Sequence, residues 1–258
     1  MDLADLAAFA VTLADAARAV TLGAVDRAAE NKHEGGGYDP VTAADRAAEN
    51  AMRALIRKTF PDHGIIGEEY GEERADAEYV WVLDPIDGTK SFISGMPAWG
   101  TLIGLMRFGE PVFGVMHQPF IKERFSGDGA AAQYRGPIGN RALHTRECAK
   151  LEDAVLFTTS PLLMNKNDRA IFQRVENIVR LSRYGGDCYS YCMLAAGQID
   201  LLIETEIKPY DIIPLIPIIN GAGGIVTTWE GKPAQVGGRC VVAGDKRVHK
   251  LAMEMLNA

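Results

Sequence analysis

Apolar and polar positions follow one pattern in the first half of the chain and another in the second. Over the first 30 residues, apolar side chains recur every three or four positions among many alanines, which predicts a long helix from residue 2 to about residue 30. A second helix is expected to begin after Thr42 and to run to about Lys58. Apolar runs at 99–108 and 111–118 flank a glycine turn and predict an antiparallel hairpin. The first half is therefore expected to be helices packed against an antiparallel sheet.

From about residue 145 onward, short apolar runs alternate with helical patterns, as in an α/β layer. One of these helices, expected at 212–221, contains Pro214 and Pro217 and should bend there. The whole pattern predicts a layered α/β (α+β) fold. Residues 1–258 are expected to form a single domain, with an α+β half at 1–144 and an α/β half at 145–258.

Composition and charge exclude several classes of protein. The 258 residues are 47% hydrophobic and 24% charged, which is ordinary for a globular domain with a large core. The net charge is −7 and no polybasic run occurs, so neither nucleic acid nor an anionic membrane is expected as a partner. No uninterrupted apolar stretch reaches about 18 residues, and acidic residues precede the first apolar run, so neither a membrane helix nor a signal peptide is expected. The four cysteines complete no zinc pattern and are expected to be reduced, as in the cytoplasm.

Two aspartates follow the apolar run at 79–83, which has the composition of a buried strand. Pro85 separates Asp84 from Asp87 and is expected to end the strand, because proline cannot continue a central ladder. Both carboxylates would then lie on one corner at the carboxyl end of a strand, where α/β sheets commonly bind ligands. The alternative is that Asp-Pro and Asp-Gly simply form turns.

Two further acids occupy comparable positions. Glu68 follows a short apolar run, and Asp211 precedes an apolar helix. Carboxylates held close together repel one another unless a cation lies between them, and hard divalent cations such as magnesium prefer oxygen ligands. Three such junctions between apolar and acidic residues favour a metal site over loops alone. His63 lies in a turn just before the apolar run that leads to Glu68 and is expected to be a surface loop residue.

Together these motifs resemble one known family. Gly-Glu-Glu at 67–69, Asp-Pro-Ile-Asp-Gly-Thr at 84–89, and an acid at 211 before an apolar helix with Gly-Ala-Gly-Gly at 221–224 resemble the inositol monophosphatase family. The resemblance extends over essentially the whole chain. It implies a fold of alternating α/β/α/β/α layers and a magnesium-dependent phosphatase with two or three ions per site, manganese being possible in their place. It also implies a homodimer that acts on a small phosphate ester.

The resemblance assigns roles to particular residues. The first ion would be held by Glu68, Asp84 and the Ile86 carbonyl, and the second by Asp84, Asp87 and Asp211. The backbone amides of Gly88 and Thr89 would cradle the phosphate, as amides at a helix start do. The Thr89 hydroxyl would act with Glu68 to orient and deprotonate the attacking water, which the metal activates.

Three features upstream of these motifs have both a catalytic and a structural interpretation. Asp45 would orient ligands or water around the metals, but it also completes a capping box with Thr42. Lys32 would donate to a carboxylate or a water. The glycine-rich loop at 33–38 is either a mobile catalytic loop or a plain surface linker.

The substrate is predicted from two variant segments. The segment 185–191, with Asp187, and the sequence Lys-Pro-Tyr-Asp at 208–211 resemble the histidinol-phosphate phosphatase branch of the family. Asp187 and Glu204 would pair with the amine of histidinol phosphate, whereas Asp187 could instead cap the following helix. Arg183 would lie near the same pocket or at the surface. Tyr189, Tyr191 and Tyr210 would line an imidazole pocket or belong to the core.

Other functions stay open at this point. The same chemistry could act on inositol phosphate, fructose bisphosphate or a 3′-phosphoadenosine nucleotide, although few basic residues are available for a second phosphate or a nucleotide. A catalytically silent relative, acting as a binding or regulatory protein, is disfavoured because every carboxylate that the chemistry needs is present.

Overall fold

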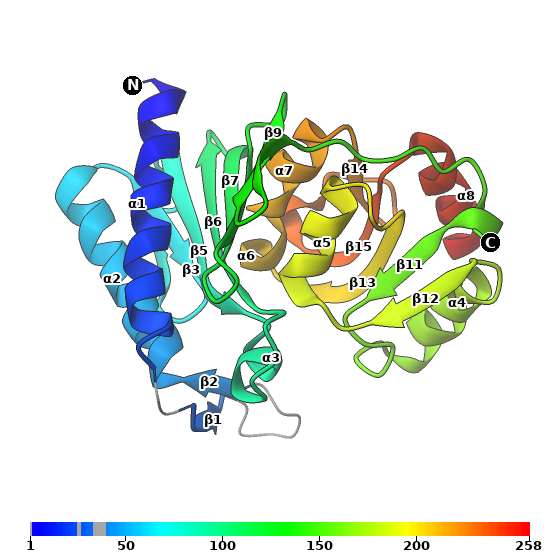
Figure 1. Cartoon of the computed structure of the whole chain (residues 1–258), viewed down its shortest axis with the longest axis horizontal. Coiled ribbons are helices and arrows are strands. Elements are labelled where there is room, and N and C mark those ends of the chain that lie inside the picture. Colours follow the sequence, from blue (N-terminus) through cyan, green and yellow to red (C-terminus); the bar gives the residue numbers. More distant parts are fainter. Residues whose placement is uncertain (1, 25–26, 33–39) are drawn as a thin grey trace.

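The structure, a computed structural model, describes residues 2–24, 27–32 and 40–258. Helices and sheets alternate in five layers, as Figure 1 shows: a helix pair, an eight-stranded sheet, a middle helix layer, a five-stranded sheet and an outer helix pair. The layered α/β architecture predicted from the sequence is confirmed. The functional residues discussed below lie where the large sheet meets the middle layer.

The first half of the chain forms the large sheet and the helices beside it. The helices are α1 (Leu3–Thr21), α2 (Ala43–Thr59) and the short α3 (Thr89–Ile93). The strands of the sheet, in sequence order, are β3 (Gly64–Gly67), β4 (Gly71–Glu73), β5 (Tyr79–Asp87), β6 (Gly100–Arg107), β7 (Glu110–Gln118), β8 (Glu123–Gly127), β9 (Ala132–Gly136) and β10 (Gly139–Ala142). Their spatial order is β10-β9-β8-β7-β6-β5-β3-β4. All neighbours are antiparallel except β3 and β5, and a separate ribbon pairs β1 (Ala29–Asn31) with β2 (Pro40–Thr42).

The second half forms the smaller, mixed sheet, in the order β12-β11-β13-β15-β14. Its strands are β11 (Val155–Thr158), β12 (Leu181–Tyr184), β13 (Leu201–Ile207), β14 (Ile225–Thr228) and β15 (Gly238–Ala243). The helices are α4 (Lys166–Glu176), α5 (Asp187–Ala195), α6 (Pro209–Ile212), α7 (Leu215–Gly221) and α8 (Lys246–Leu256), with 3-10 turns at Leu151–Asp153 and Ala234–Val236.

Apolar side chains bury each sheet from both sides. One cluster fills the space between α1, α2 and the large sheet, and includes Leu13, Met52 and Trp81. A second cluster joins the two sheets through α5 and α7, and a third lies under α4 and α8. Because strands covered on both faces cannot alternate with polar residues, their sequences read as continuous apolar runs. All four cysteines are free and buried in these layers.

Two helix predictions need correction. The first helix ends at Thr21 rather than near residue 30, because Leu22 caps it and Gly23 follows. The helix expected at 212–221 is two helices, α6 and α7, and the break falls at Pro214, which has no N–H to donate to the preceding turn. Pro217 is accommodated within α7.

The prediction for His63 was also wrong. Its side chain is buried, and its ring stacks on Phe60 with a centroid separation of 4.6 Å and on Tyr79 at 5.1 Å. The indole N–H of Trp81 donates to His63 Nδ1 at 3.1 Å. His63 is therefore part of an aromatic cluster in the core. Among the described residues, none of the helices has the length and apolar character needed to cross a lipid bilayer.

Candidate active site

A β-bulge brings Asp84 and Asp87 together. Strand β5 does not end at Pro85, as predicted, but continues to Asp87 with a register shift against β6: Asp84 lies opposite Leu102, and Asp87 lies opposite Gly100. In a regular strand, residues three apart point to opposite faces. The extra residue in the bulge changes that alternation. A proline is tolerated in a bulge because no hydrogen bond of the ladder requires an N–H at that position.

Backbone amides orient three aspartate carboxylates toward one point. The amide of Ile86 donates to Asp84 at 3.1 Å, that of Cys188 to Asp87 at 2.5 Å, and that of Lys208 to Asp211 at 2.8 Å. One oxygen from each of these aspartates lies within 4.8 Å of one from each of the others. Asp211 reaches this point because it is the third residue of the short helix α6, which Pro209 begins. The structure thus brings together three of the predicted metal ligands.

The electrostatics of this trio favour a bound cation. Burial raises the pKa of Asp84 and of Asp87 well above the usual range, and neighbouring carboxylates raise both further. Burial also raises the pKa of Asp211 to about 7. A divalent cation at this point would satisfy oxygens that otherwise repel one another, and an all-oxygen set suits a hard ion. Such an ion would supply positive charge to a phosphate group and to the attacking water.

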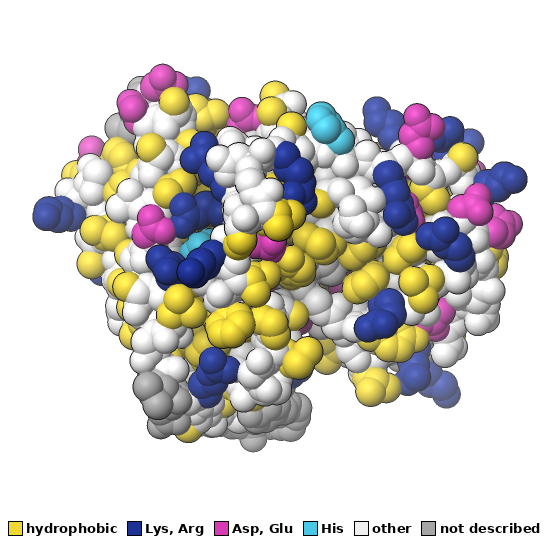
Figure 2. All heavy atoms as spheres, in the orientation of Figure 1, with side chains coloured by type: hydrophobic (Ala, Val, Ile, Leu, Met, Phe, Trp, Pro, Cys, Tyr) yellow, Lys and Arg dark blue, Asp and Glu magenta, His cyan; other side chains and the backbone are white. Residues whose placement is uncertain are grey.

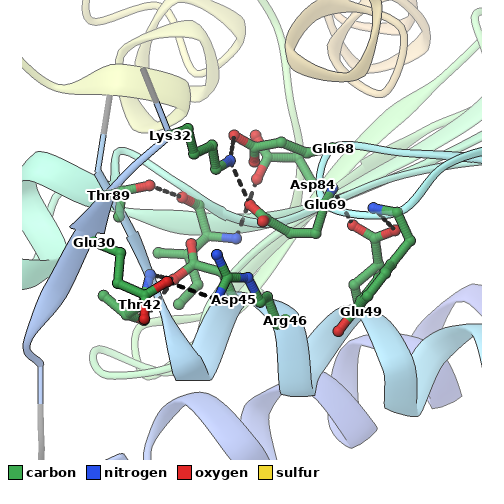
Figure 3. Close-up of polar contacts among 12 residues, drawn as sticks. Glu30, Lys32, Thr42, Asp45, Arg46, Glu49, Glu68, Glu69, Asp84 and Thr89 are labelled. Atoms are coloured by element: carbon green, nitrogen blue, oxygen red, sulfur yellow. Dashed lines mark hydrogen bonds and ion pairs between the residues drawn. The ribbon is translucent and has the colours of Figure 1, made fainter. Parts of the chain in front are cut away.

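Glu68 lies beside the trio and is held by a lysine. Its carboxylate raises the pKa of Asp84, while Lys32 donates to Glu68 at 2.9 Å and to Glu69 at 2.6 Å (Figure 3). Burial on its own would lower the pKa of Lys32. The two glutamates raise this pKa, and the net shift is upward. Burial raises the pKa of Glu69 to about 7, although its bond to Lys32 opposes this. Lys32 thus meets a carboxylate, as predicted, whereas Glu69 was missed, although it adjoins Glu68 in the sequence.

A fully buried ion pair supports the segment that carries Glu68. Glu49, on α2, accepts hydrogen bonds from Arg53 Nε at 2.8 Å and from the amides of Glu69 at 2.7 Å and Tyr70 at 3.2 Å (Figure 3). These bonds fix the turn after β3 relative to α2. The sequence offered no signal for this role, because a glutamate four residues before an arginine usually forms a solvent-exposed pair on a helix.

The two carboxylate oxygens of Asp45 have different surroundings. One carboxylate oxygen accepts from the Thr42 amide at 2.8 Å and from the Thr42 hydroxyl at 2.5 Å, which confirms the capping box. The other oxygen is buried and has no hydrogen-bond partner among the residues that the structure describes. Burial raises the pKa of Asp45, and Glu68 adds to the shift. A buried acceptor beside Glu68 suits a residue that holds a water next to a metal.

The junction between β5 and α3 contains Ile86, Gly88 and Thr89. The Thr89 hydroxyl donates to the Ile86 carbonyl at 3.1 Å and so fixes the direction of this predicted ligand (Figure 3). Gly88 adopts a positive φ of 83° and begins α3 without a side-chain cap. A β-carbon on Gly88 would lie 2.8 Å from the Asp187 carboxylate, so only glycine permits this approach. The loop predicted at 33–38 lies outside the described residues.

A cavity of about 200 Å³ joins the metal carboxylates to the other acids predicted for the substrate. Its walls include Asp87 and Asp211 together with Asp187, Glu204 and the exposed Glu206. No lysine or arginine lies among its described lining residues. The structure therefore gathers five carboxylates around one space.

The alternative that Asp187 caps a helix is wrong. Asp187 is the first residue of α5, and the cap position belongs to Gly186, which makes no side-chain bond. Gly185, Gly186 and Asp187 all have positive φ, at 86°, 104° and 43°. The side chain is thereby turned toward α3, where the Ser91 hydroxyl donates to it at 2.7 Å. Burial raises the pKa of Asp187.

Glu204 forms the opposite side of the cavity. It accepts hydrogen bonds from the Thr158 hydroxyl at 3.0 Å, the Thr159 amide at 2.7 Å and the Thr159 hydroxyl at 3.1 Å. Burial nevertheless raises its pKa to about 8. The hydroxyl of Tyr191 is buried in the same wall, and no described residue offers it a hydrogen bond. By contrast, Arg183 is exposed on the edge strand β12 and does not line this cavity.

The remaining two tyrosines play structural roles. Tyr189 is half-buried and donates to Glu123 at 2.6 Å, and Tyr210 packs on the cluster of Val80, Val82 and Ile213. Two of the three tyrosines thus belong to the core, and Tyr191 alone lines the cavity.

Comparison with known proteins gives one consistent family. A plant protein named bifunctional phosphatase IMPL2, chloroplastic (Arabidopsis thaliana) is 45% identical over 230 residues, 84% of this chain and 65% of the relative. This chain therefore spans about two thirds of that relative's length. The histidinol-phosphatase of Mycobacterium tuberculosis is 34% identical over 96% of both chains. The solved structure of an inositol monophosphatase from Zymomonas mobilis is 38% identical over the full length of both chains, with a TM-score of 0.88.

The match covers almost the entire sequence. The profile described as the inositol monophosphatase family matches residues 2–258, which include the bulged aspartates of β5, the Gly-Glu-Glu turn and the acid of α6. The chain belongs to the inositol monophosphatase family of phosphatases.

Proposed function

We propose that this protein is a magnesium-dependent phosphatase that releases phosphate from histidinol phosphate. One observation supports this substrate above all: Asp187 and Glu204 line the same cavity as Asp87 and Asp211, beyond the carboxylates that the metals need. A neutral polyol would leave the half-buried Asp187 and the buried Glu204 without a charged partner. Histidinol phosphate carries an amine and an imidazole beside its phosphate, and either cation would form a charge-assisted bond there.

In the proposed reaction, different residues would bind the metals, receive the phosphate, accept a proton and orient the substrate. Asp84, Asp87, Asp211 and Glu68 would hold the magnesium ions, and the Thr89 hydroxyl would keep the Ile86 carbonyl directed at them. The Gly88–Thr89 turn would receive the phosphate. Glu68, beside Asp84 and held by Lys32, would accept a proton from the attacking water. Asp187 and Glu204 would orient the organic part of the substrate.

The names of the relatives support this proposal without deciding it. One relative is a histidinol-phosphatase, and the Zymomonas structure is an inositol monophosphatase. Inositol 1-phosphate is therefore the second candidate substrate, with the same metal site and the same attack by water.

The test measures phosphate release with magnesium from histidinol phosphate and inositol 1-phosphate side by side. We expect kcat/KM for histidinol phosphate to exceed that for inositol 1-phosphate at least a hundredfold. The variant Glu204→Gln should reduce that preference, while Glu152→Gln, which changes an exposed acid that does not line the cavity, should serve as the matched control. Equal rates on both substrates, or an unchanged preference in Glu204→Gln, would refute the proposed substrate.

A further inference from the structure

A second cavity, of about 260 Å³, lies between α1 and the strands β7, β8 and β9. Four cationic side chains line it, Arg18, Lys122, Arg124 and Arg135, against a single carboxylate, that of Asp15. Figure 2 shows Lys and Arg side chains gathered on this face between α1 and β9. For a chain of net charge −7, this concentration of positive charge calls for an explanation.

Strand register places two of these cations, Arg124 and Arg135, in one row with His117. His117 on β7 lies opposite Arg124 on β8, and Arg124 lies opposite Arg135 on β9. Directly opposed residues in antiparallel strands have their side chains on the same face, and like charges in that position are destabilising. Asp15 compensates only Arg124, at 2.6 Å. Within the described part of the chain, Arg18, Lys122 and Arg135 form no ion pair, so three of the four cations that line the cavity lack a counter-charge.

Two buried nitrogen atoms in this wall also lack partners. His117 is 5% exposed, and its Nδ1–H donates to the Glu123 carbonyl at 3.0 Å, which leaves the lone pair on Nε2. Neither that atom nor the Nε–H of Arg124 has a hydrogen-bond partner among the described residues. Native proteins rarely leave buried polar atoms unpaired, so each such atom requires a reason.

We propose that this cavity binds inorganic phosphate in its hydrogenphosphate form. The arginine donors match the planar, bidentate geometry of phosphate oxygens. Inorganic phosphate retains a P–O–H group at neutral pH, and this hydroxyl donates to Nε2 of His117 while the charged oxygens accept from Arg124 and its neighbours. Sulfate, which has no such hydrogen, cannot complete the set.

The active-site cavity does not compete for phosphate once metal is removed. Its described lining carries five carboxylates and no cation, so without metal it repels an anion. Phosphate binding to protein in EDTA therefore reports on the basic cavity, and the result is independent of the substrate proposed above.

The experiment titrates inorganic phosphate into the full chain in EDTA by calorimetry at constant ionic strength. We expect one site, weakened at least tenfold by Arg135→Gln and by Arg18→Gln, which alter exposed side chains and should leave the fold intact. Arg141→Gln is the matched control, because Arg141 is exposed on β10 and does not line this cavity. Sulfate and methyl phosphate dianion should each bind at least tenfold more weakly than inorganic phosphate.

A second readout reports locally. The ring signals of His117, identified by their loss in His117→Asn, should shift as phosphate is added. Sulfate that binds as tightly as phosphate would overturn the hydrogenphosphate assignment. Phosphate binding that is absent, or that Arg135→Gln and Arg18→Gln leave unchanged, would overturn the site itself.

Discussion

The Ser91 hydroxyl donates a hydrogen bond to the Asp187 carboxylate at 2.7 Å across 96 positions of sequence. Ser91 belongs to α3, which follows the bulged strand of the large sheet, and Asp187 begins α5 in the middle layer. The bond fixes a half-buried acid at the rim of the metal site. It therefore connects the part of the site that would contact the phosphate with the part that would recognise the rest of the substrate.

Replacing Asp187 should alter substrate preference more than chemistry. We expect Asp187→Asn to lower kcat/KM for histidinol phosphate roughly tenfold to a hundredfold, the range for loss of a hydrogen bond between charged groups. Hydrolysis of glycerol phosphate, which has no amine, should fall less than about threefold by the same reasoning. Ser91→Ala, which removes only the donor to Asp187, should produce a smaller loss in the same direction. Equal losses on both esters would mean that Asp187 acts on the metal site rather than on the amine.

Removing the Asp84 carboxylate should abolish activity without lowering the stability of the metal-free protein. Asp84→Asn should lower phosphatase activity to below a few per cent, because Asp84 is the buried aspartate between Glu68 and Asp87. Without metal, the variant should unfold at the same temperature as the natural protein or higher, since one source of carboxylate repulsion is removed. Added magnesium should raise the melting temperature of the natural protein and not that of the variant. Activity well above a few per cent would contradict the role of Asp84 as a metal ligand.

The buried pair of Glu49 and Arg53 should dominate the stability of α2. Glu49→Ala leaves the Arg53 charge buried and frees two amides of the turn after Glu68, so we expect a loss of about 3–5 kcal/mol in the free energy of unfolding. Denaturant unfolding measures this directly. Glu254→Ala, which breaks the exposed pair with Lys250 on α8, is the control and should change the value by no more than about 0.5 kcal/mol. Similar losses in both variants would contradict the supporting role of Glu49.

His117 should make stability depend on pH in a defined window. Burial, together with the neighbouring charge of Arg124, lowers the pKa of His117 from 6.5 to about 4. Between these two values the unfolded chain binds a proton that the folded chain does not, so the free energy of unfolding should fall as pH decreases from 6.5 to 4. His117→Asn keeps a donor for the Glu123 carbonyl and cannot titrate. Unfolding at pH 7.5 and pH 5 should show a smaller decrease in this variant, because His63 and His249 titrate in both proteins. An equal decrease would mean that His117 is protonated in the native state.

Much of the architecture could be predicted from local patterns. The two helical segments of the first half, the β6–β7 hairpin and the alternation after residue 145 follow from apolar periodicity, and the capping box of α2 follows from the order of Thr42 and Asp45. The ends of the helices were harder to predict. They depend on the backbone properties of single residues, Gly23 and Pro214, which the apolar periodicity does not encode.

The candidate site was predictable only as a set of residues. Asp84, Asp87 and Asp211 could be named from the sequence through the family resemblance, but the bulge that turns Asp84 and Asp87 to one side could not, because it depends on register with β6. Likewise, the partners of Glu49 and Glu204 come from turns and strands that are distant in sequence. The basic row of His117, Arg124 and Arg135 could not be predicted from the sequence, because it forms only through the pairing of β7, β8 and β9.

The bond from the Cys188 amide to Asp87 joins residues 101 positions apart, one in each half of the chain. Asp87 therefore acquires its orientation only when the second half has docked on the first. Long-range contacts of this kind form late, because the loop between them must close first. The metal site is consequently a reporter of completed folding: during refolding, recovery of metal affinity should lag behind the formation of either sheet.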